Sequence, residues 1–278
     1  MIRLAAAFAL TLLALAPAAS AQAPSPQAGR EIVIGRSYTI RSAILGDERR
    51  LNVYLPAHYA DPSRRFPVLI LLDGGEAEDF HPISGLAQIT AANGFGQELI
   101  VVGIEGVDRR HDLTPVITSP ADRQTLPKAG GADAYRRFLI EEVKPWVAAH
   151  YRTSGRTGLV GESLAGLFTL ETLLKTPGAF DDYIASSPSL WLDDQALSKA
   201  ATDHLRKGAF NGKRLWIGLG GEGPEMQAGA DRVVAALKAA APTGLTWTFD
   251  PRPTERHDTT YVPVVTAALR SFYPLGKP

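Results

Sequence analysis

A serine between glycines is at the centre of the chemistry that this sequence can support. Residues 157–168 read as a short apolar strand, then Gly-Glu-Ser-Leu-Ala-Gly, then the start of a helical pattern. In that context a G-x-S-x-G motif is typical of a nucleophile elbow, a sharp turn that holds the serine above the end of a strand. Gly161 and Gly166 would let the strand and the helix cross closely. We therefore expect Ser163 to be a nucleophile, the alternative being a tight turn without chemistry.

The base that such a serine needs can be sought among the later histidines. A serine hydroxyl is a weak nucleophile at neutral pH, so it requires a base and a third group that orients the base. Where an elbow of this kind carries these groups, the chain order is serine, acid, histidine. His204 lies inside a predicted amphipathic helix, as surface histidines often do. His257 lies in a loop between the last predicted strand and the last helix, so we expect His257 to be the base.

The orienting acid should follow the strand predicted at 213–219. Glu222 and Glu225 both qualify, because either carboxylate could accept the proton of the imidazole ring. Glu222 is preferred since it lies nearer the end of the strand, where position is better fixed. Glu225 also has a structural explanation, as a carboxylate that stabilises the start of a helix. Asp250 and Asp258 are minor alternatives.

Hydrogen-bond donors for a developing oxyanion are expected at two places. One is the amide of Leu164, directly after the serine, and the other is an amide in the turn that follows the strand at 66–73. We expect Gly75 to supply the second donor, because glycine allows close approach of the backbone. The alternative for Gly74 and Gly75 is a plain turn.

Two arginines are candidates for substrate binding. Arg109 and Arg110 could hold a carboxylate or another oxygen-rich group, or they could form structural ion pairs with Asp108 and Asp112. Trp191 and Phe80 are aromatic residues that could either line the pocket or pack in the core.

Patterns of strand and helix alternate along the chain and predict the α/β class. Two runs joined by a polar turn indicate a hairpin at the start, and apolar runs without alternation are typical of parallel strands covered on both faces. The order predicts a mostly parallel sheet of about eight strands with helices on both faces. Residues 105–129 form a long polar segment, which we expect to be a functional or disordered loop. The expected strands cover 36–44, 50–55, 66–73, 98–104, 156–160, 183–187, 213–219 and 245–250, and the main helices 81–93, 132–151, 195–207, 228–240 and 259–272.

The first residues are typical of a secretory signal peptide. Arg3 precedes an Ala/Leu-rich run, and Ala19-Ser20-Ala21 has the pattern of a cleavage site. We expect cleavage after Ala21, a disordered leader at 22–30 and a single α/β domain at 31–278. Periplasm is the preferred compartment, with full secretion as the alternative.

Charge and cysteine content exclude several classes of function. Lys plus Arg total 29 and Asp plus Glu total 29, so there is no basic field for nucleic acid or an anionic membrane. The expected partner is therefore a small molecule. With Cys at 0, a thiol nucleophile and a cysteine-based metal site are excluded. Histidine pairs with ligand spacing are absent from the sequence, so we expect neither a metal nor another cofactor.

Taken together, these motifs resemble the putative-esterase family of α/β hydrolases, which includes the enterochelin and salmochelin esterases and is related to esterase D. The chain departs from the family pattern at Ala165, where relatives often have glycine. The segments that carry the resemblance are 52–56, 66–68, 72–74, 102–104, 109, 112–115, 138–142, 144–145, 151–152, 161–167, 187–191 and the block around His257.

The resemblance implies hydrolysis of carboxylic esters through an acyl-enzyme on an α/β-hydrolase fold. Ser163 and His257 match the catalytic positions of the family, with Glu222 as the third member. Siderophore-cleaving relatives use an arginine near the position of Arg109 to contact the trilactone, so the resemblance implies a substrate-binding role for Arg109. Siderophore-type lactones and aryl or alkyl esters are thus expected substrates. The alternatives are acyl transfer on the same fold and a ligand-binding protein that has lost activity.

Overall fold

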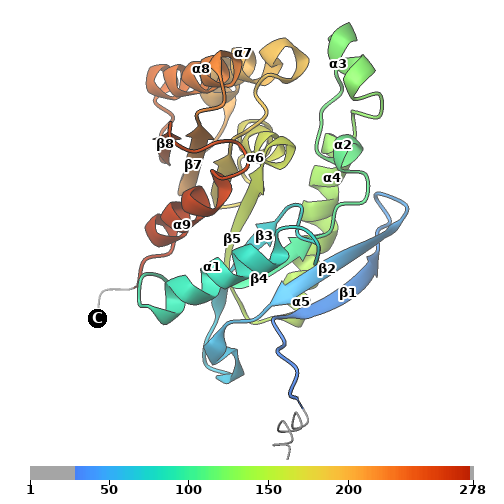
Figure 1. Ribbon diagram of the computed structural model, residues 1–278, viewed down its shortest axis with the longest axis vertical. Coiled ribbons are helices and arrows are strands. Elements are labelled where there is room, and N and C mark those ends of the chain that lie inside the picture. Colours follow the sequence, from blue (N-terminus) through green and yellow to red (C-terminus); the bar gives the residue numbers. More distant parts are fainter. Residues whose placement is uncertain (1–28, 276–278) are drawn as a thin grey trace, which may run out of the picture. The chain divides into compact units, whose positions relative to one another are not determined.

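The computed structural model describes residues 29–275, so the predicted signal peptide and most of the leader lie outside the described residues. Ile34–Pro278 forms one compact unit. A single eight-stranded sheet crosses it, with helices on both faces (Figure 1). The predicted α/β class and the strand count are confirmed.

The sheet has the strand order β1-β2-β4-β3-β5-β6-β7-β8. Strands β1 and β2 form an antiparallel hairpin, β2 is antiparallel to β4, and the remaining neighbours are parallel. The strand predicted at 36–44 was wrong at its end, because Ser42 N–H donates to Asp47 O and turns the chain. The strands are β1 (Arg36–Arg41), β2 (Glu48–Tyr54), β3 (Phe66–Leu71), β4 (Ile100–Ile104), β5 (Thr153–Glu162), β6 (Asp182–Ser186), β7 (Lys213–Gly220) and β8 (Leu245–Arg252).

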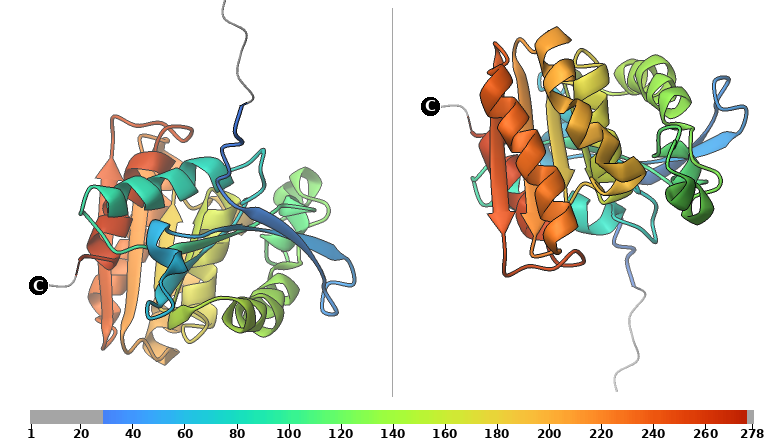
Figure 2. Two further views of the ribbon diagram at one scale, coloured as in Figure 1. Left: turned by 90° about the horizontal axis from the view of Figure 1, so that it is seen from below. Right: turned by 90° about the horizontal axis from the view of Figure 1, so that it is seen from above.

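Helices α1 (Phe80–Ala92) and α9 (Tyr261–Phe272) pack together on one face of the sheet. The long helices α7 and α8 run side by side on the other face (Figure 2). None of the helices in the described part of the chain is long and apolar enough to cross a membrane. The other helices are α2 (Arg109–Asp112), α3 (Pro120–Thr125), α4 (Ala132–Phe138), α5 (Lys144–His150), α6 (Leu164–Lys175), α7 (Leu192–Lys207) and α8 (Pro224–Ala240), with a short 3-10 turn at Ala57–Ala60 and a π turn at Leu139–Val143.

Two sequence predictions need correction, that of a loop at 105–129 and that of a helix at 132–151. The segment 105–129 contains two short helices, α2 and α3, each opened by a side chain that accepts a backbone N–H, Asp108 for α2 and Ser119 for α3. The helix predicted at 132–151 is interrupted by the π turn at Leu139–Val143. Apolar spacing could not reveal α2 and α3, because helices of 4 and 6 residues are too short to show a hydrophobic stripe.

Burial on both faces explains the unbroken apolar runs of the central strands. In β3, Val68 and Ile70 belong to the core under α4 to α8, whereas Leu69 and Leu71 belong to the core under α1 and α9. Alternate side chains of a strand point to opposite faces. A strand with helices on both faces is therefore apolar at every position, as the parallel-strand interpretation requires.

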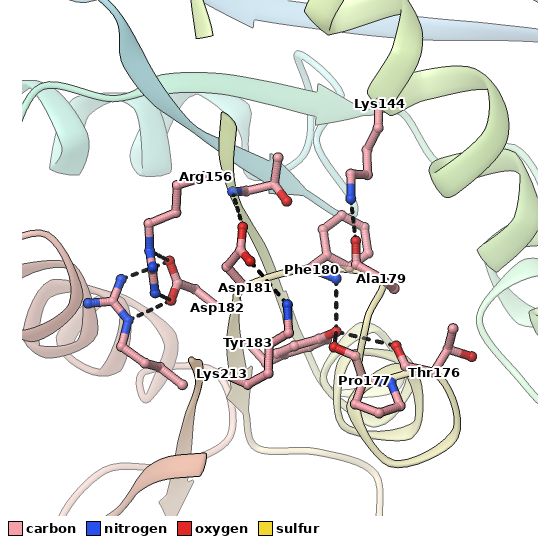
Figure 3. A network of polar contacts seen from close by, with 12 residues as sticks. Lys144, Arg156, Thr176, Pro177, Ala179, Phe180, Asp181, Asp182, Tyr183 and Lys213 are labelled. Carbon is pink, nitrogen blue, oxygen red and sulfur yellow. Dashed lines mark hydrogen bonds and ion pairs between the residues drawn. The ribbon is translucent and has the colours of Figure 1, made fainter. Parts of the chain in front are cut away.

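Ion pairs hold the amino ends of the central strands together. The buried carboxylate of Asp182, at the start of β6, accepts hydrogen bonds from Arg156 on β5 at 2.6 and 2.9 Å. Arg214 on β7 donates to the same carboxylate at 2.6 and 2.8 Å. Figure 3 shows Arg156 beside Asp182 and Lys213 reaching Asp181. A buried charge is tolerated only when it is paired, so this network fixes the alignment of the strands whose opposite ends carry the candidate site.

Candidate active site

Ser163 occupies a strained turn between β5 and α6. Its φ of 61° and ψ of −120° lie in a region that side chains rarely adopt. Three backbone hydrogen bonds fix the turn: Ser163 N–H donates to Ser186 O at 3.1 Å, and Ser163 O accepts from Leu167 N–H at 2.8 Å and from Ser189 N–H at 3.1 Å. Such strain persists only where the surrounding structure imposes it, which is common at functional sites.

The two glycines of the motif are required by close backbone approach. A Cβ at Gly161 would lie 2.5 Å from the Cβ of Ala165, and one at Gly166 would lie 2.5 Å from Ser186 O. Neither position can take a side chain without moving α6. Ala165 itself is fully buried at this crossing, so the departure from the family pattern is accommodated by Gly161.

The loops after β7 and β8 bring His257 and Glu222 together. Nδ1 of His257 lies 2.5 Å from Oε2 of Glu222. The other carboxylate oxygen, Oε1, accepts from the Ser187 hydroxyl and, at 3.0 Å, from Gly220 N–H. The Glu222 side chain is 5% exposed and that of His257 is 48% exposed, so the carboxylate is the fixed member of the pair.

The other carboxylates considered from the sequence lie elsewhere. Glu225 is exposed at the start of α8. Asp250 accepts from Arg252 at 2.9 Å, and Asp258 accepts from Arg256 at 2.8 Å. Glu222 is therefore the carboxylate, among the four considered, that bonds His257.

This hydrogen bond changes the acidity of both partners. The bond to Glu222 raises the pKa of His257 above its usual value, although partial burial opposes the rise; the negative charge of Glu162 adds to it and Arg109 opposes it. Burial works against the ionised form of Glu222, but hydrogen bonds from His257, Ser187 and Gly220 hold the pKa of that carboxyl below its usual range. The pair is thus an imidazole beside an ionised carboxylate.

A pH dependence follows from this pair. A base must be neutral to accept a proton, so we expect kcat/KM for a neutral ester to rise with pH, with a midpoint above the usual histidine value of about 6.5. Glu222→Gln removes the group that stabilises the imidazolium, so the midpoint should shift to lower pH and the plateau rate should fall. The control is Glu225→Gln, an exposed residue, whose profile should match the wild type. An unshifted midpoint in Glu222→Gln would contradict the assignment.

Ser163 and His257 line one cavity of about 650 Å³. Within the described structure, the side-chain hydrogen bond of Ser163 goes to Ser189 Oγ at 3.3 Å, and none joins Ser163 to His257. Hydrogen bonds between catalytic groups are often long without substrate and tighten when it binds. The cavity is also lined by Leu164, Glu222, Arg109 and Trp191.

The two predicted oxyanion donors differ in position. Leu164 lines the cavity as the first residue of α6, and the first N–H groups of a helix have no partner within the helix. Gly75 is not among the residues that line the cavity. Its N–H donates to Oε2 of Glu78 at 2.7 Å. The neighbouring Gly74 allows the turn to pack on β4, since a Cβ there would lie 2.3 Å from Gly103 Cα.

Arg109 has partners that the sequence did not suggest. Its Nε donates to Asp73 Oδ2 at 2.8 Å, and its Nη2 donates to Glu162 O at 3.3 Å. The alternative from the sequence, ion pairs with Asp108 and Asp112, does not form, because Asp108 pairs with Lys128 and Asp112 pairs with Arg49. Arg109 therefore links the turn after β3 to the elbow, and it also lines the cavity. The neighbouring Arg110 lines the same cavity.

Of the two aromatic candidates, one lines the cavity and the other lies in the core. Trp191 is partly buried and lines the cavity, whereas Phe80 is buried in the core under α1 and α9.

Sequence reasoning missed two serines next to the site. Ser187 forms a hydrogen bond with Glu222, and Ser189 forms one with Ser163. A signal was present: a serine-rich run directly follows β6, at the carboxyl edge where open α/β sheets bind ligands.

Within residues 29–275, no group of three or more histidine or acidic side chains is placed to hold a metal ion.

A mostly parallel sheet, a serine at the sharp β5–α6 turn and an acid–histidine pair on the loops after β7 and β8 define an α/β hydrolase. The chain belongs to the esterase family described as "Putative esterase", whose model matches residues 42–262. The expected family and fold are confirmed.

Curated relatives include siderophore esterases. The chain is 40% identical over 98 residues to the siderophore enterobactin esterase of Emericella nidulans, covering 32% of each chain. It is 42% identical over 86 residues to the ferri-bacillibactin esterase BesA of Bacillus subtilis, covering 30% of this chain and 29% of the relative. The matched segments thus span about a third of these relatives.

Solved structures share the fold over most of the chain. An IroE-like serine hydrolase from Shewanella oneidensis superimposes with a TM-score of 0.80 and 25% identity, covering 86% of this chain and 80% of that one. The siderophore hydrolase EstB from Aspergillus nidulans gives a TM-score of 0.76 and 25% identity, covering 91% of this chain and 100% of that one.

Proposed function

We propose that this protein is a carboxylic ester hydrolase that works through a serine acyl-enzyme. The observation that carries the proposal is the single cavity lined both by the hydroxyl of Ser163 and by His257, whose Nδ1 bonds the buried carboxylate of Glu222. Membership of the esterase family supports the same activity.

The roles of the three side chains follow from their bonds. Since Nδ1 of His257 is engaged with Glu222, Nε2 is the nitrogen that can accept the Ser163 proton as Oγ attacks the ester carbonyl. Glu222 stabilises the imidazolium that forms. The Leu164 amide, at the start of α6, is the proposed donor to the oxyanion.

The reaction then completes in two steps. The tetrahedral intermediate collapses with loss of the alcohol, which takes the proton from His257 and leaves the acyl group on Ser163 Oγ. Water attacks the acyl-enzyme, His257 accepts a proton from this water, and the carboxylic acid departs as Ser163 regains its proton. Atoms and charges balance without any further reactant.

Siderophore-type esters and aryl or alkyl esters are the proposed substrates. The names of the relatives, siderophore enterobactin esterase and ferri-bacillibactin esterase, support the first class. A cavity of about 650 Å³ suits a small-molecule ligand. Arg109, Arg110 and Arg256 line it, and guanidinium groups bind oxygen-rich anionic groups well. Export through the predicted signal peptide, to the periplasm or beyond, is part of the same proposal.

A covalent probe tests the proposed nucleophile. We expect a fluorophosphonate to label the wild-type protein on the peptide that contains Ser163, because only an activated serine reacts at a useful rate. Mass spectrometry locates the adduct. Ser189→Ala is the control, since it removes the neighbouring hydroxyl and should still be labelled. An unlabelled wild type, or an adduct on another serine, would refute the proposed mechanism.

A panel of esters tests the substrate class. Aryl acetates, longer acyl esters, and ferric and iron-free catecholate lactones can be compared by kcat/KM. We expect turnover of aryl esters and of at least one lactone, with free carboxylate as the product. Turnover of aryl esters but of no lactone would contradict the siderophore-type substrates and keep the esterase activity.

A further inference from the structure

The segment between α2 and α4 forms a closed loop. Its two ends meet at Thr114, whose carbonyl oxygen accepts from Gly130 N–H at 3.2 Å and from Ala132 N–H at 3.1 Å. We call residues 115–129, which include α3, the α3 loop; it rises on the same side of the molecule as α7 and α8 (Figure 1). Compact loops of roughly 6–16 residues with adjacent ends are frequently functional.

A reciprocal pair of contacts attaches the α3 loop to the first turn of α7. Oδ1 of Asp193 accepts from Thr118 N–H at 2.7 Å, from Ser119 N–H at 2.6 Å and from the Thr118 hydroxyl at 3.0 Å. In return, Asp193 N–H donates to Oδ2 of Asp122 at 2.7 Å. One carboxylate thus holds the backbone that leads into α3.

This attachment is maintained against an unfavourable backbone conformation. Asp193, Asp194 and Gln195 have φ values of 54°, 51° and 61°, which non-glycine residues adopt at a cost. Burial disfavours the ionised form of Asp193, but the hydrogen bonds from Ser119 and Thr118 outweigh it and hold the pKa of this carboxyl below its usual range. The carboxylate is therefore charged at neutral pH, and hydrogen bonds to a charged acceptor are stronger than those to a neutral one.

The α3 loop contributes directly to the candidate active site. Thr125 and Leu126 line the same cavity as Ser163 and His257. Leu126 is buried and anchors the loop in the core, whereas Thr125 is exposed. Trp191, which also lines the cavity, lies two residues before Asp193. The contact between Asp193 and the α3 loop therefore joins two parts of the cavity wall.

We propose that Asp193 is a positioning residue that determines ester specificity: by fixing the α3 loop on α7 it sets the width of the cavity at Thr125, next to the anchored Leu126. This inference rests on the proposed esterase function. Asp193 does not touch the reacting atoms; it acts through the loop. A cavity wall that is displaced by about 1 Å can change rates by up to ~100-fold, so a few hydrogen bonds suffice for such a role.

The test compares Asp193→Ala with Asp193→Asn, which keeps an oxygen acceptor. The matched control is Asp194→Ala, because Asp194 has nearly the same φ and its exposed carboxylate pairs with Lys199 rather than with the α3 loop. Both alanine variants carry the same backbone penalty, so a difference between them reports the loop contact. Kinetics with 4-nitrophenyl acetate and 4-nitrophenyl octanoate are combined with amide hydrogen exchange over residues 115–129.

In Asp193→Ala we expect the ratio of kcat/KM for octanoate to that for acetate to rise about tenfold, chiefly through a lower KM for octanoate. Hydrogen exchange at Thr118 and Ser119 should become faster. Asp193→Asn and Asp194→Ala should stay within about twofold of the wild-type ratio. If Asp193→Ala does not fold, Asp122→Ala removes the return bond and should change the ratio in the same direction.

An unchanged ratio in folded Asp193→Ala, or an equal change in Asp194→Ala, would overturn the role of Asp193 while leaving the esterase intact. A wild type that turns over neither ester and is not labelled at Ser163 would instead overturn the proposed function, and the specificity role with it. Unchanged hydrogen exchange in Asp193→Ala would show that the carboxylate does not hold the loop.

Discussion

Ser163→Ala is expected to lower kcat/KM for an aryl acetate by at least ~10⁴-fold. In the proposed mechanism this hydroxyl forms the covalent intermediate, and water in the cavity would be a poor substitute for it. The side chain of Ser163 makes one hydrogen bond, to Ser189 at 3.3 Å, so the free energy of unfolding should change by no more than about 1 kcal/mol. Steady-state kinetics and a thermal melt measure both quantities.

The matched control for this substitution is Ser189→Ala, which removes the other hydroxyl of the same hydrogen bond. It should keep kcat/KM within about tenfold of the wild type, because the proposed mechanism gives Ser189 no covalent role. A folded Ser163→Ala variant that retained more than about one hundredth of the wild-type rate would show that the serine is not the nucleophile.

His257→Ala should lower kcat/KM by about 10³- to 10⁴-fold and abolish the rising limb of the pH profile. The substitution removes the proposed base for the serine proton, and the histidine titration that we expect to govern activity disappears with it. The His257 side chain is half exposed, so its loss should leave the fold stable. Kinetics from pH 5 to 9, over the range where histidine titrates, measure the effect.

His204→Ala is the matched control, since His204 is the other histidine that follows the serine in the sequence. It lies in α7 and lines a separate, smaller cavity of about 180 Å³. Its removal should leave both kcat/KM and the pH profile unchanged. A His257→Ala variant with wild-type turnover would mean that another group serves as the base.

The sequence predicted the sheet and the elbow well because both depend on local patterns. Strands covered on both faces must be apolar throughout, as Val68 to Leu71 are, and a close strand-to-helix crossing requires glycine at Gly161 and Gly166. These requirements act within a few residues, so they are visible in the chain itself. The two short helices of the 105–129 segment were missed because 4 and 6 residues are too few to show a periodic apolar pattern.

By itself, the sequence determined the α/β class, the family and a short set of candidate side chains. Only the tertiary structure decided which carboxylate meets His257, since Glu222, Glu225, Asp250 and Asp258 have equivalent chemistry and differ only in where their loops lie. It likewise decided that the Gly75 amide bonds Glu78 and that Asp193 holds the α3 loop. The physical reason is range: a hydrogen bond depends on a distance of about 3 Å between atoms far apart in the chain, and local propensity carries no information about it.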